Sequence, residues 1–172
     1  MNKPALLATL AAPVAFGGDF EAAKVTHSGS FHVDAPPELS IHLFTAAGEI
    51  LWADGWHPVI LSGDGTEKGT VFVTSHNEEV TIWVVVDYDP ENFHVRYSRV
   101  TPSIRAGTVE VFVRSDGQGG SNVDVSYQLT ALNEAGNRDL AHFEAQAYSE
   151  MMAEWEIEIR DAKIDYQAEF PQ

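Results

Sequence analysis

The side chains best suited to acid–base chemistry gather around one predicted hairpin. His76 ends a predicted strand, Asn77-Glu78 has the length of a two-residue turn, and Glu79 begins the next strand. The preceding hairpin could place His57 across from His76. This cluster could transfer protons or, more remotely, hold a metal ion. A pair of surface histidines at a sheet edge is the alternative that we favour, so we predict no bound metal and no cofactor.

Recognisable catalytic motifs do not occur in the sequence. None of the seven histidines stands in an HExxH or HxH arrangement, and there is no cysteine. Disulfides, thiolate metal sites and cysteine nucleophiles are therefore excluded. The glycines at 63–65 and 119–120 connect predicted strands, which is the wrong context for dinucleotide binding. Catalytic residues therefore stay unassigned.

The two faces of the predicted hairpin differ in composition. A two-residue turn places Phe72 opposite Trp83 and Thr74 opposite Thr81, so this face carries aromatic rings and hydroxyls. The other face carries six aliphatic side chains at 71, 73, 80, 82, 84 and 86. Ligand pockets combine apolar surface with a few polar groups, so we expect the aromatic face to line a cavity. A one-residue slip would exchange the faces, and the aliphatic face is the alternative.

The following strand adds further candidates. A five-residue loop would place Trp83 opposite Tyr97. Arg96 and Arg99 lie on opposite faces of this strand, so at most one could enter the cavity as an anion clamp, and we expect an exposed salt bridge for each. The predicted ligand-binding residues are Trp56, Phe72, Thr74, Thr81, Trp83, Tyr97, Phe143, Ala147 and Met151.

These residues must be positioned by an antiparallel sheet. A first strand is expected over 23–33, followed by a helix that begins near Pro36-Pro37 and a short second helix at 49–53. Six further strands are expected at 56–61, 70–76, 79–88, 93–100, 104–114 and 122–132. Strand follows strand with no helix between, which predicts a meander.

A long helix is expected at the C-terminal end. From about Arg138 to Asp165 no proline or glycine interrupts the chain, which corresponds to a helix about 40 Å long. Its predicted apolar stripe is Leu140, Phe143, Ala147, Met151, Trp155 and Ile159. The sequence therefore predicts an α+β fold, in which a curved antiparallel sheet of about seven strands wraps around this helix.

This element order resembles the helix-grip fold of the START-like (SRPBCC) superfamily, which includes polyketide cyclases, plant pollen-allergen lipid binders and uncharacterised bacterial proteins. The segments that carry the resemblance are 35–38, 43–45, 52–58 and 127–137, together with Trp155, and they are similar to one bacterial branch. The resemblance implies a deep cavity between the sheet and the long helix. Members use that cavity to hold lipids, sterols and phenolics or to catalyse cyclisation and dehydration.

Length and charge limit the remaining possibilities. The 172 residues suffice for one domain, which we assign to 23–172. The net charge of −16 disfavours nucleic-acid binding. We expect residues 1–22 to form an N-terminal extension and the protein to be cytoplasmic. The alternative is that these residues are a signal segment, in which case the protein would be periplasmic or secreted. The apolar run within it is too short to span a membrane.

Three functional hypotheses follow. The first is a protein that carries or sequesters a small, largely hydrophobic molecule. The second is a cyclase- or dehydratase-type enzyme, in which Tyr97, His57 or His76 moves protons on a polyketide-like or aromatic substrate. A third, less favoured, is a partner protein that uses the acidic face of its helix. The sequence leaves the oligomeric state open.

Overall fold

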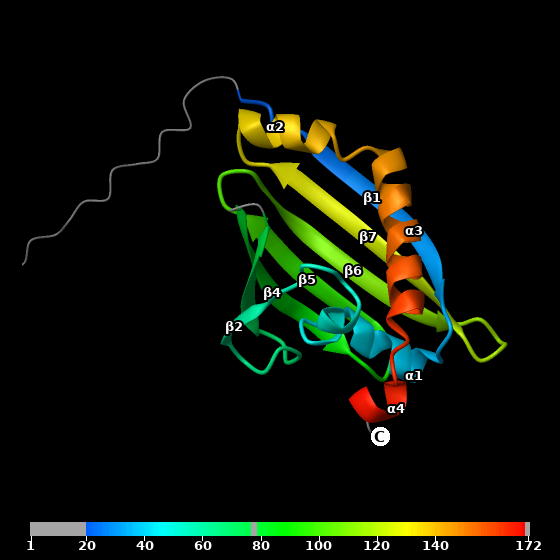
Figure 1. Ribbon diagram of the computed structural model, residues 1–172. Helices are drawn as coiled ribbons and strands as arrows, with labels where there is room; N and C mark the ends of the chain where they lie inside the picture. The colour runs from blue at the N-terminus through cyan, green and yellow to red at the C-terminus, as the bar shows by residue number, and fades with distance from the viewer. Residues whose placement is uncertain (1–19, 77–78, 171–172) are drawn as a thin grey trace, which may run out of the picture.

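A single curved antiparallel sheet forms the body of the protein, shown in Figure 1 as a computed structural model that describes residues 20–76 and 79–170. The strand order is β1-β7-β6-β5-β4-β3-β2. The strands are β1 (Lys24–Val33), β2 (Val59–Ser62), β3 (Val71–His76), β4 (Glu79–Asp89), β5 (His94–Thr101), β6 (Arg105–Ser115) and β7 (Ser121–Ala131). The predicted antiparallel sheet of seven strands is confirmed: β2 to β7 form a six-strand meander, and β1 pairs with β7. Most of the predicted N-terminal extension, and the 77–78 turn, lie outside the described residues.

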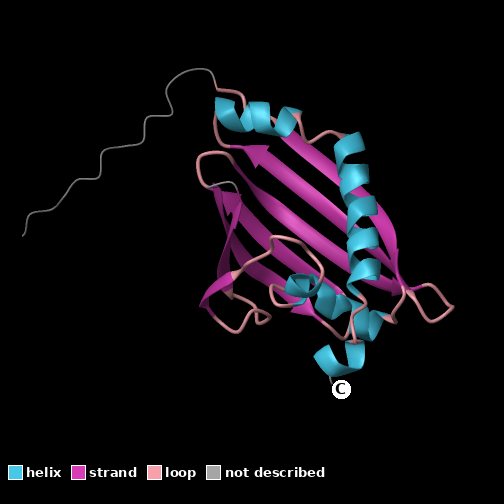
Figure 2. Ribbon diagram, viewed as in Figure 1, coloured by secondary structure: helices cyan, strands magenta, loops and turns pink. Residues whose placement is uncertain are grey.

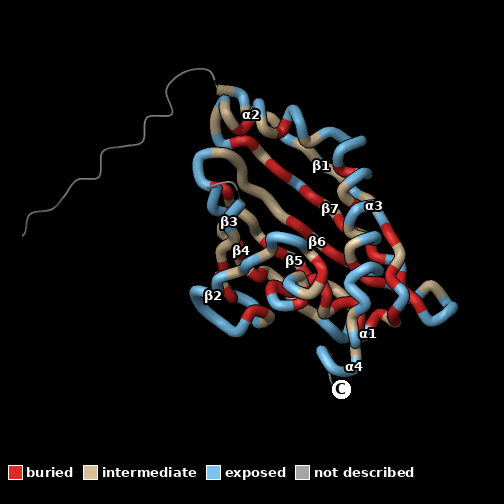
Figure 3. The backbone as a smooth tube through the Cα atoms, in the orientation of Figure 1, coloured by how far each residue is buried: buried red, intermediate tan, exposed pale blue. Residues whose placement is uncertain are grey.

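Inward-facing side chains alternate with outward-facing ones along the strands, as a sheet with one covered face requires (Figure 3). On β7 the buried positions include Val123, Val125, Tyr127 and Leu129. The helices lie on this concave face (Figure 2). Side chains on the concave face therefore form the hydrophobic core and also the floor of any cavity beneath the helices.

The register of the β3–β4 hairpin is as predicted: His76 pairs with Glu79, and Phe72 pairs with Trp83. The predicted pairing of Trp83 with Tyr97 is wrong, because Trp83 lies opposite Arg99. The β4–β5 loop is shorter than expected and a bulge follows Val85. The resulting shift is two residues, which moves no side chain to the other face.

Two short helical segments follow β1, as predicted. They are α1 (Pro37–Ser40), which continues into the 3₁₀ helix η1 (Ile41–Phe44), and the 3₁₀ helix η2 (Gly48–Leu51). A Cβ atom at Gly48 would lie 1.9 Å from the His42 carbonyl oxygen, so only glycine allows these two segments to approach so closely. The segment 37–51 thus folds as one compact wedge at the end of the sheet.

The predicted uninterrupted helix over 138–165 is wrong. The chain instead forms α2 (Glu134–Ala141), α3 (Ala145–Ala162) and a short α4 (Tyr166–Glu169). The break near Phe143 has a tertiary cause: its carbonyl is 2.7 Å from His27 Nε2, and its ring packs on Tyr127 and Tyr148. Propensity and the absence of proline or glycine could not reveal contacts made with distant strands.

The buried face of α3 is rotated relative to the predicted stripe. Tyr148, Met152 and Ile159 are buried, whereas Ala147 is exposed and Met151 is only partly buried. Two contacts set this rotation. The Tyr148 hydroxyl donates to the Val125 carbonyl at 2.7 Å, and Met152 packs directly over Gly29 on β1. As a result α3 lies along β1 and β7 at one side of the sheet (Figure 1).

We expect the two adjacent methionines of α3 to differ sharply in their contribution to stability. Met152→Ala removes a buried side chain and should lower the free energy of unfolding by about 3 kcal/mol. Met151→Ala is the matched control and should cost less than about 1 kcal/mol. Urea unfolding followed by circular dichroism measures both. Equal losses, or a larger loss for Met151→Ala, would contradict the observed orientation of α3.

Candidate functional site

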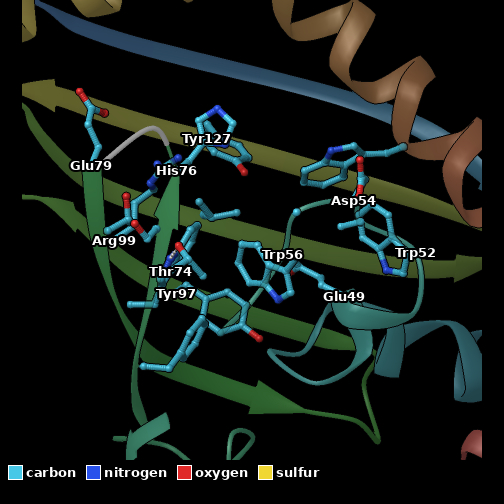
Figure 4. A pocket seen from close by; sticks show the side chains of 18 of the residues that line it. Glu49, Trp52, Asp54, Trp56, Thr74, His76, Glu79, Tyr97, Arg99 and Tyr127 are labelled. Atoms are coloured by element: carbon cyan, nitrogen blue, oxygen red, sulfur yellow. Dashed lines mark hydrogen bonds between the residues drawn. The ribbon is translucent and has the colours of Figure 1, made fainter. Parts of the chain in front are cut away.

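A cavity of about 330 Å³ opens between the concave face of the sheet, the η2–β2 segment and α3 (Figure 4). Its walls come from η2 and the loop that follows it, from strands β3 to β7, and from Trp155 on α3. Seven of its nineteen lining residues are aromatic: Trp52, Trp56, Phe72, Trp83, Tyr97, Tyr127 and Trp155. All four tryptophans of the chain are among them.

The aromatic rings that line the cavity also pack against one another. Phe72 and Trp83 stack with their ring centroids 5.9 Å apart. Trp56 meets both rings edge-on, and Tyr97 stands nearly perpendicular to both. Such edge-to-face and offset contacts are favourable arrangements for aromatic pairs. The wall is therefore a connected aromatic cluster rather than a set of independent side chains.

Three of these aromatic side chains also donate hydrogen bonds to buried backbone carbonyls of the 43–46 segment. The pairs are Trp52 Nε1 to Leu43 (2.9 Å), Trp56 Nε1 to Ala46 (2.9 Å) and Tyr97 hydroxyl to Phe44 (2.8 Å). Each bond satisfies a carbonyl that water cannot reach and fixes the orientation of a ring. The bonds thus tie the cavity wall to the wedge formed by α1, η1 and η2.

Arg99 places a cation inside the cavity. Its guanidinium lies over the rings of Trp83 and Tyr127, with its carbon 4.9 Å and 5.8 Å from their centroids. Burial lowers the pKa of Arg99. The expected exposed salt bridge is wrong for Arg99 and equally for Arg96, because neither forms an ion pair within residues 20–76 and 79–170. The Nε atoms of both arginines are buried and have no hydrogen-bond partner there.

Glu49 places a carboxyl group on the other side of the cavity, beyond Trp56 in Figure 4. Desolvation raises its pKa to about 8, so the group is predominantly protonated at neutral pH. A protonated carboxyl can both donate and accept a hydrogen bond. Burial also raises the pKa of Tyr127 to about 12, which keeps its phenol neutral.

Six of the predicted ligand-binding residues lie together in this cavity, namely Trp56, Phe72, Thr74, Thr81, Trp83 and Tyr97. The threonine hydroxyls are already engaged, however. Thr74 accepts a hydrogen bond from Trp83 Nε1 at 2.9 Å, and Thr81 pairs with Thr101 at 2.8 Å. They therefore stabilise the wall, and the polar groups most open to a ligand come from other residues.

The three predicted residues from the C-terminal helix do not line the cavity. Ala147 is exposed, Met151 packs partly against the core, and Phe143 borders a separate depression beside Leu140. The cause is the α2–α3 break together with the rotation of α3. Of the helix residues named in the predicted stripe, Trp155 reaches the cavity.

The predicted approach of His57 and His76 is also wrong. His57 precedes β2, is exposed, and borders a different depression, whereas His76 and Glu79 lie exposed at the cavity mouth. Within residues 20–76 and 79–170, no group of three or more histidine or carboxylate side chains could hold a metal ion. No helix of those residues is long and apolar enough to cross a membrane.

Sequence reasoning missed Glu49, Trp52, Tyr127 and Trp155 as lining residues, and it expected Arg99 to be exposed. Trp52 and Trp56 flank a glycine-containing loop, and this spacing could have predicted that both side chains line the same cavity. Glu49 gave no such signal, because an acid in the first turn of a helix is ordinarily explained by the helix dipole.

No protein-family model matches the sequence, and no curated protein matches it. Solved structures are similar in fold. Major latex-like protein 151 from Panax ginseng is 14% identical, with a TM-score of 0.60 over 83% of this chain and 98% of that chain. Truncated norcoclaurine synthase from Thalictrum flavum is 10% identical, with a TM-score of 0.61 over 90% and 99%. An uncharacterized protein from Rhizobium leguminosarum is 12% identical, with a TM-score of 0.60 over 82% and 97%. The chain therefore has the helix-grip fold.

We expect Glu49 to make the protein less stable as the pH rises. Its pKa is about 8 in the folded chain against 4.5 for an unperturbed glutamate, so the folded state retains a proton that the unfolded state releases. Glu49→Gln should therefore gain stability over the wild type from about pH 5 to about pH 8, by at most about 1.4 kcal/mol per pH unit.

Urea unfolding of both proteins across this range measures the difference. Glu79→Gln is the control, since it removes an exposed carboxylate from the mouth of the same cavity. Parallel stability curves for the wild type and Glu49→Gln would show that the Glu49 carboxyl is not desolvated.

Proposed function

We propose that the protein binds a small, largely apolar molecule in the cavity between the sheet and α3, as a carrier or a sequestering protein. The observation that carries this proposal is the aromatic wall, in which all four tryptophans line one space of about 330 Å³. Ligand pockets are concave and mostly apolar, with a small number of polar groups that orient the ligand. Glu49 and Arg99 are polar groups of this kind.

The size and shape of the cavity favour a compact ligand. A volume of about 330 Å³ lies near the lower end of the range of ligand pockets, which is about 300–1,000 Å³. Flat aromatic surfaces at Trp56 and Trp83 complement another planar ring. We therefore favour a small aromatic or planar molecule over a long-chain lipid.

One structural neighbour shows that a protein of similar fold can hold small aromatic molecules. Norcoclaurine synthase from Thalictrum flavum has been solved in complex with dopamine and hydroxybenzaldehyde, and that structure has a TM-score of 0.58 with this chain at 12% identity. The helix-grip fold can thus accommodate small aromatic molecules. At this level of identity the neighbour supplies the fold and not the ligand.

The second candidate is a cyclase- or dehydratase-type enzyme, which Glu49 favours. The Tyr97 hydroxyl donates to the Phe44 carbonyl, His57 lies outside the cavity and His76 lies at its mouth, so these residues are poorly placed to move protons. Glu49 faces the cavity with a pKa of about 8, which suits a general acid or base near neutral pH. Enzymatic turnover of a bound aromatic substrate would therefore depend on this carboxyl.

Binding of a neutral apolar probe tests the proposal. N-phenyl-1-naphthylamine should bind the wild type saturably, with a rise in probe fluorescence. Val109 is buried in the cavity wall, so the larger ring of Val109→Phe should fill part of the space and weaken binding at least about tenfold.

Thr108→Phe is the matched control, because position 108 lies on the same strand and on the opposite face of the sheet. It should leave the affinity within about twofold of the wild type. Circular dichroism confirms that both variants fold. Absence of probe binding to the wild type, or equal binding by all three proteins, would contradict a ligand site in this cavity.

A further inference from the structure

We propose that the ligand of this cavity is an anion, a carboxylate carried on an aromatic or planar body, and that Arg99 binds the carboxylate. This inference rests on the proposed binding function and specifies its ligand class. The observation behind it is a cation that lines an aromatic cavity and has no counter-ion within residues 20–76 and 79–170. Figure 4 shows Arg99 beside Thr74, across the cavity from Glu49.

The nearest carboxylate that acts on Arg99, that of Asp139, is ion-paired with Arg105 and forms no ion pair with Arg99. The cross-strand partners of Arg99 are Trp83 on β4 and Gly107 on β6, neither of which is acidic. The two rings that it contacts, those of Trp83 and Tyr127, stabilise a cation but accept no strong hydrogen bond from it. A guanidinium offers five N–H donors in a planar fork that matches a carboxylate. Of these donors Nε is buried without a partner, so the guanidinium is incompletely compensated by the protein, and a ligand carboxylate in the cavity would pair with its terminal N–H groups.

Arg96 on the same strand provides an internal comparison. Its cross-strand partners are Asp87 and Glu110, both acidic, and it lies on the opposite face of the sheet. The two arginines share one property, since each has a buried Nε without a hydrogen-bond partner and neither forms an ion pair within residues 20–76 and 79–170. They differ in their surroundings: Arg96 lies between two acids that contact His94, whereas Arg99 faces the aromatic cavity. The charge of Arg96 is therefore compensated by nearby carboxylates on its own face of the sheet, and the cross-strand neighbours of Arg99 offer no such compensation on the cavity face.

The other charged groups of the cavity leave Arg99 as its dominant interior charge. Arg105 is ion-paired with Asp139. Glu49 is predominantly protonated at neutral pH, because its pKa is about 8. Asp54 and Glu79 are exposed at the rim, where water screens them. An incoming carboxylate therefore meets an aromatic wall with one unneutralised cation.

The same geometry sets the orientation of the ligand. With the carboxylate on Arg99, the planar body would lie along the rings of Trp56 and Trp83, and its far end would approach Glu49. The protonated Glu49 carboxyl could then hydrogen-bond a hydroxyl or carbonyl at that end. Apolar contact would supply most of the binding free energy, and Arg99 would make the cavity selective for an anionic ligand over a neutral one of the same shape.

The test compares two probes of nearly equal shape, naphthalene-2-carboxylate and the neutral naphthalene-2-carboxamide, by isothermal titration calorimetry with the full chain. The wild type should bind the carboxylate at least about tenfold more tightly than the amide, as expected for a charge-assisted hydrogen bond. Arg99→Gln should abolish this preference while keeping the affinity for the amide within about threefold. Arg99→Lys should retain part of the preference, because it keeps the charge and loses the fork.

Arg96→Gln is the matched control and should bind both probes as the wild type does. Equal affinity of the wild type for the two probes, or a carboxylate preference that survives in Arg99→Gln, would overturn the inference. Displacement of N-phenyl-1-naphthylamine separates this failure from failure of the proposed function. If the neutral fluorophore binds and no carboxylate preference appears, the cavity binds ligands and the anion assignment is wrong. If the fluorophore and both probes fail to bind, the ligand site itself is wrong.

Discussion

Backbone carbonyls of the 43–46 segment lie in the interior, where water cannot satisfy them, and each must find a donor in the protein. Leu43, Phe44 and Ala46 are at most 1% exposed, and their carbonyls accept hydrogen bonds from Trp52, Tyr97 and Trp56. This requirement fixes the position of three aromatic side chains in the cavity wall. The hydrogen bond from Tyr97 connects the wedge between β1 and β2 to the sheet. The hydrogen bonds from Trp52 and Trp56 hold these two side chains in the cavity wall, so that they do not occupy the cavity.

This use of polar groups explains which side chains remain open to a ligand. The hydroxyls of Tyr97, Thr74 and Thr81 are engaged in bonds within the wall, so they give the cavity shape and little reactivity. Glu49, Arg99 and the Tyr127 hydroxyl are the inner polar groups that line the cavity without a hydrogen bond to another group of residues 20–76 and 79–170. The two ends of the cavity differ chemically, because one carries the protonated carboxyl of Glu49 and the other the guanidinium of Arg99, which has no counter-ion within the described residues. Such a cavity can select both the presence and the direction of a planar ligand.

The architecture could be predicted largely from the sequence, because alternation, turn residues and the Pro36-Pro37 helix start are local signals. The two-residue hairpin predicted which residues of β3 and β4 share a face, and the mixture of aromatic rings and hydroxyls favoured the face that lines the cavity. The helix contribution did not, because the break at Phe143 and the burial of Met152 depend on His27 and Gly29, more than a hundred residues earlier in the chain. The environments of Glu49 and Arg99 were likewise hidden, since burial of a charged side chain is a property of the assembled fold.

A crystal structure of the full chain with naphthalene-2-carboxylate would test the central claim most directly. The account predicts that the rings lie in the aromatic cavity against Trp56 and Trp83, with the carboxylate within hydrogen-bond distance of Arg99 and the far edge toward Glu49. The wall aromatics should keep their hydrogen bonds to the 43–46 carbonyls. A ligand bound outside the cavity, or one whose carboxylate points to solvent away from Arg99, would contradict it.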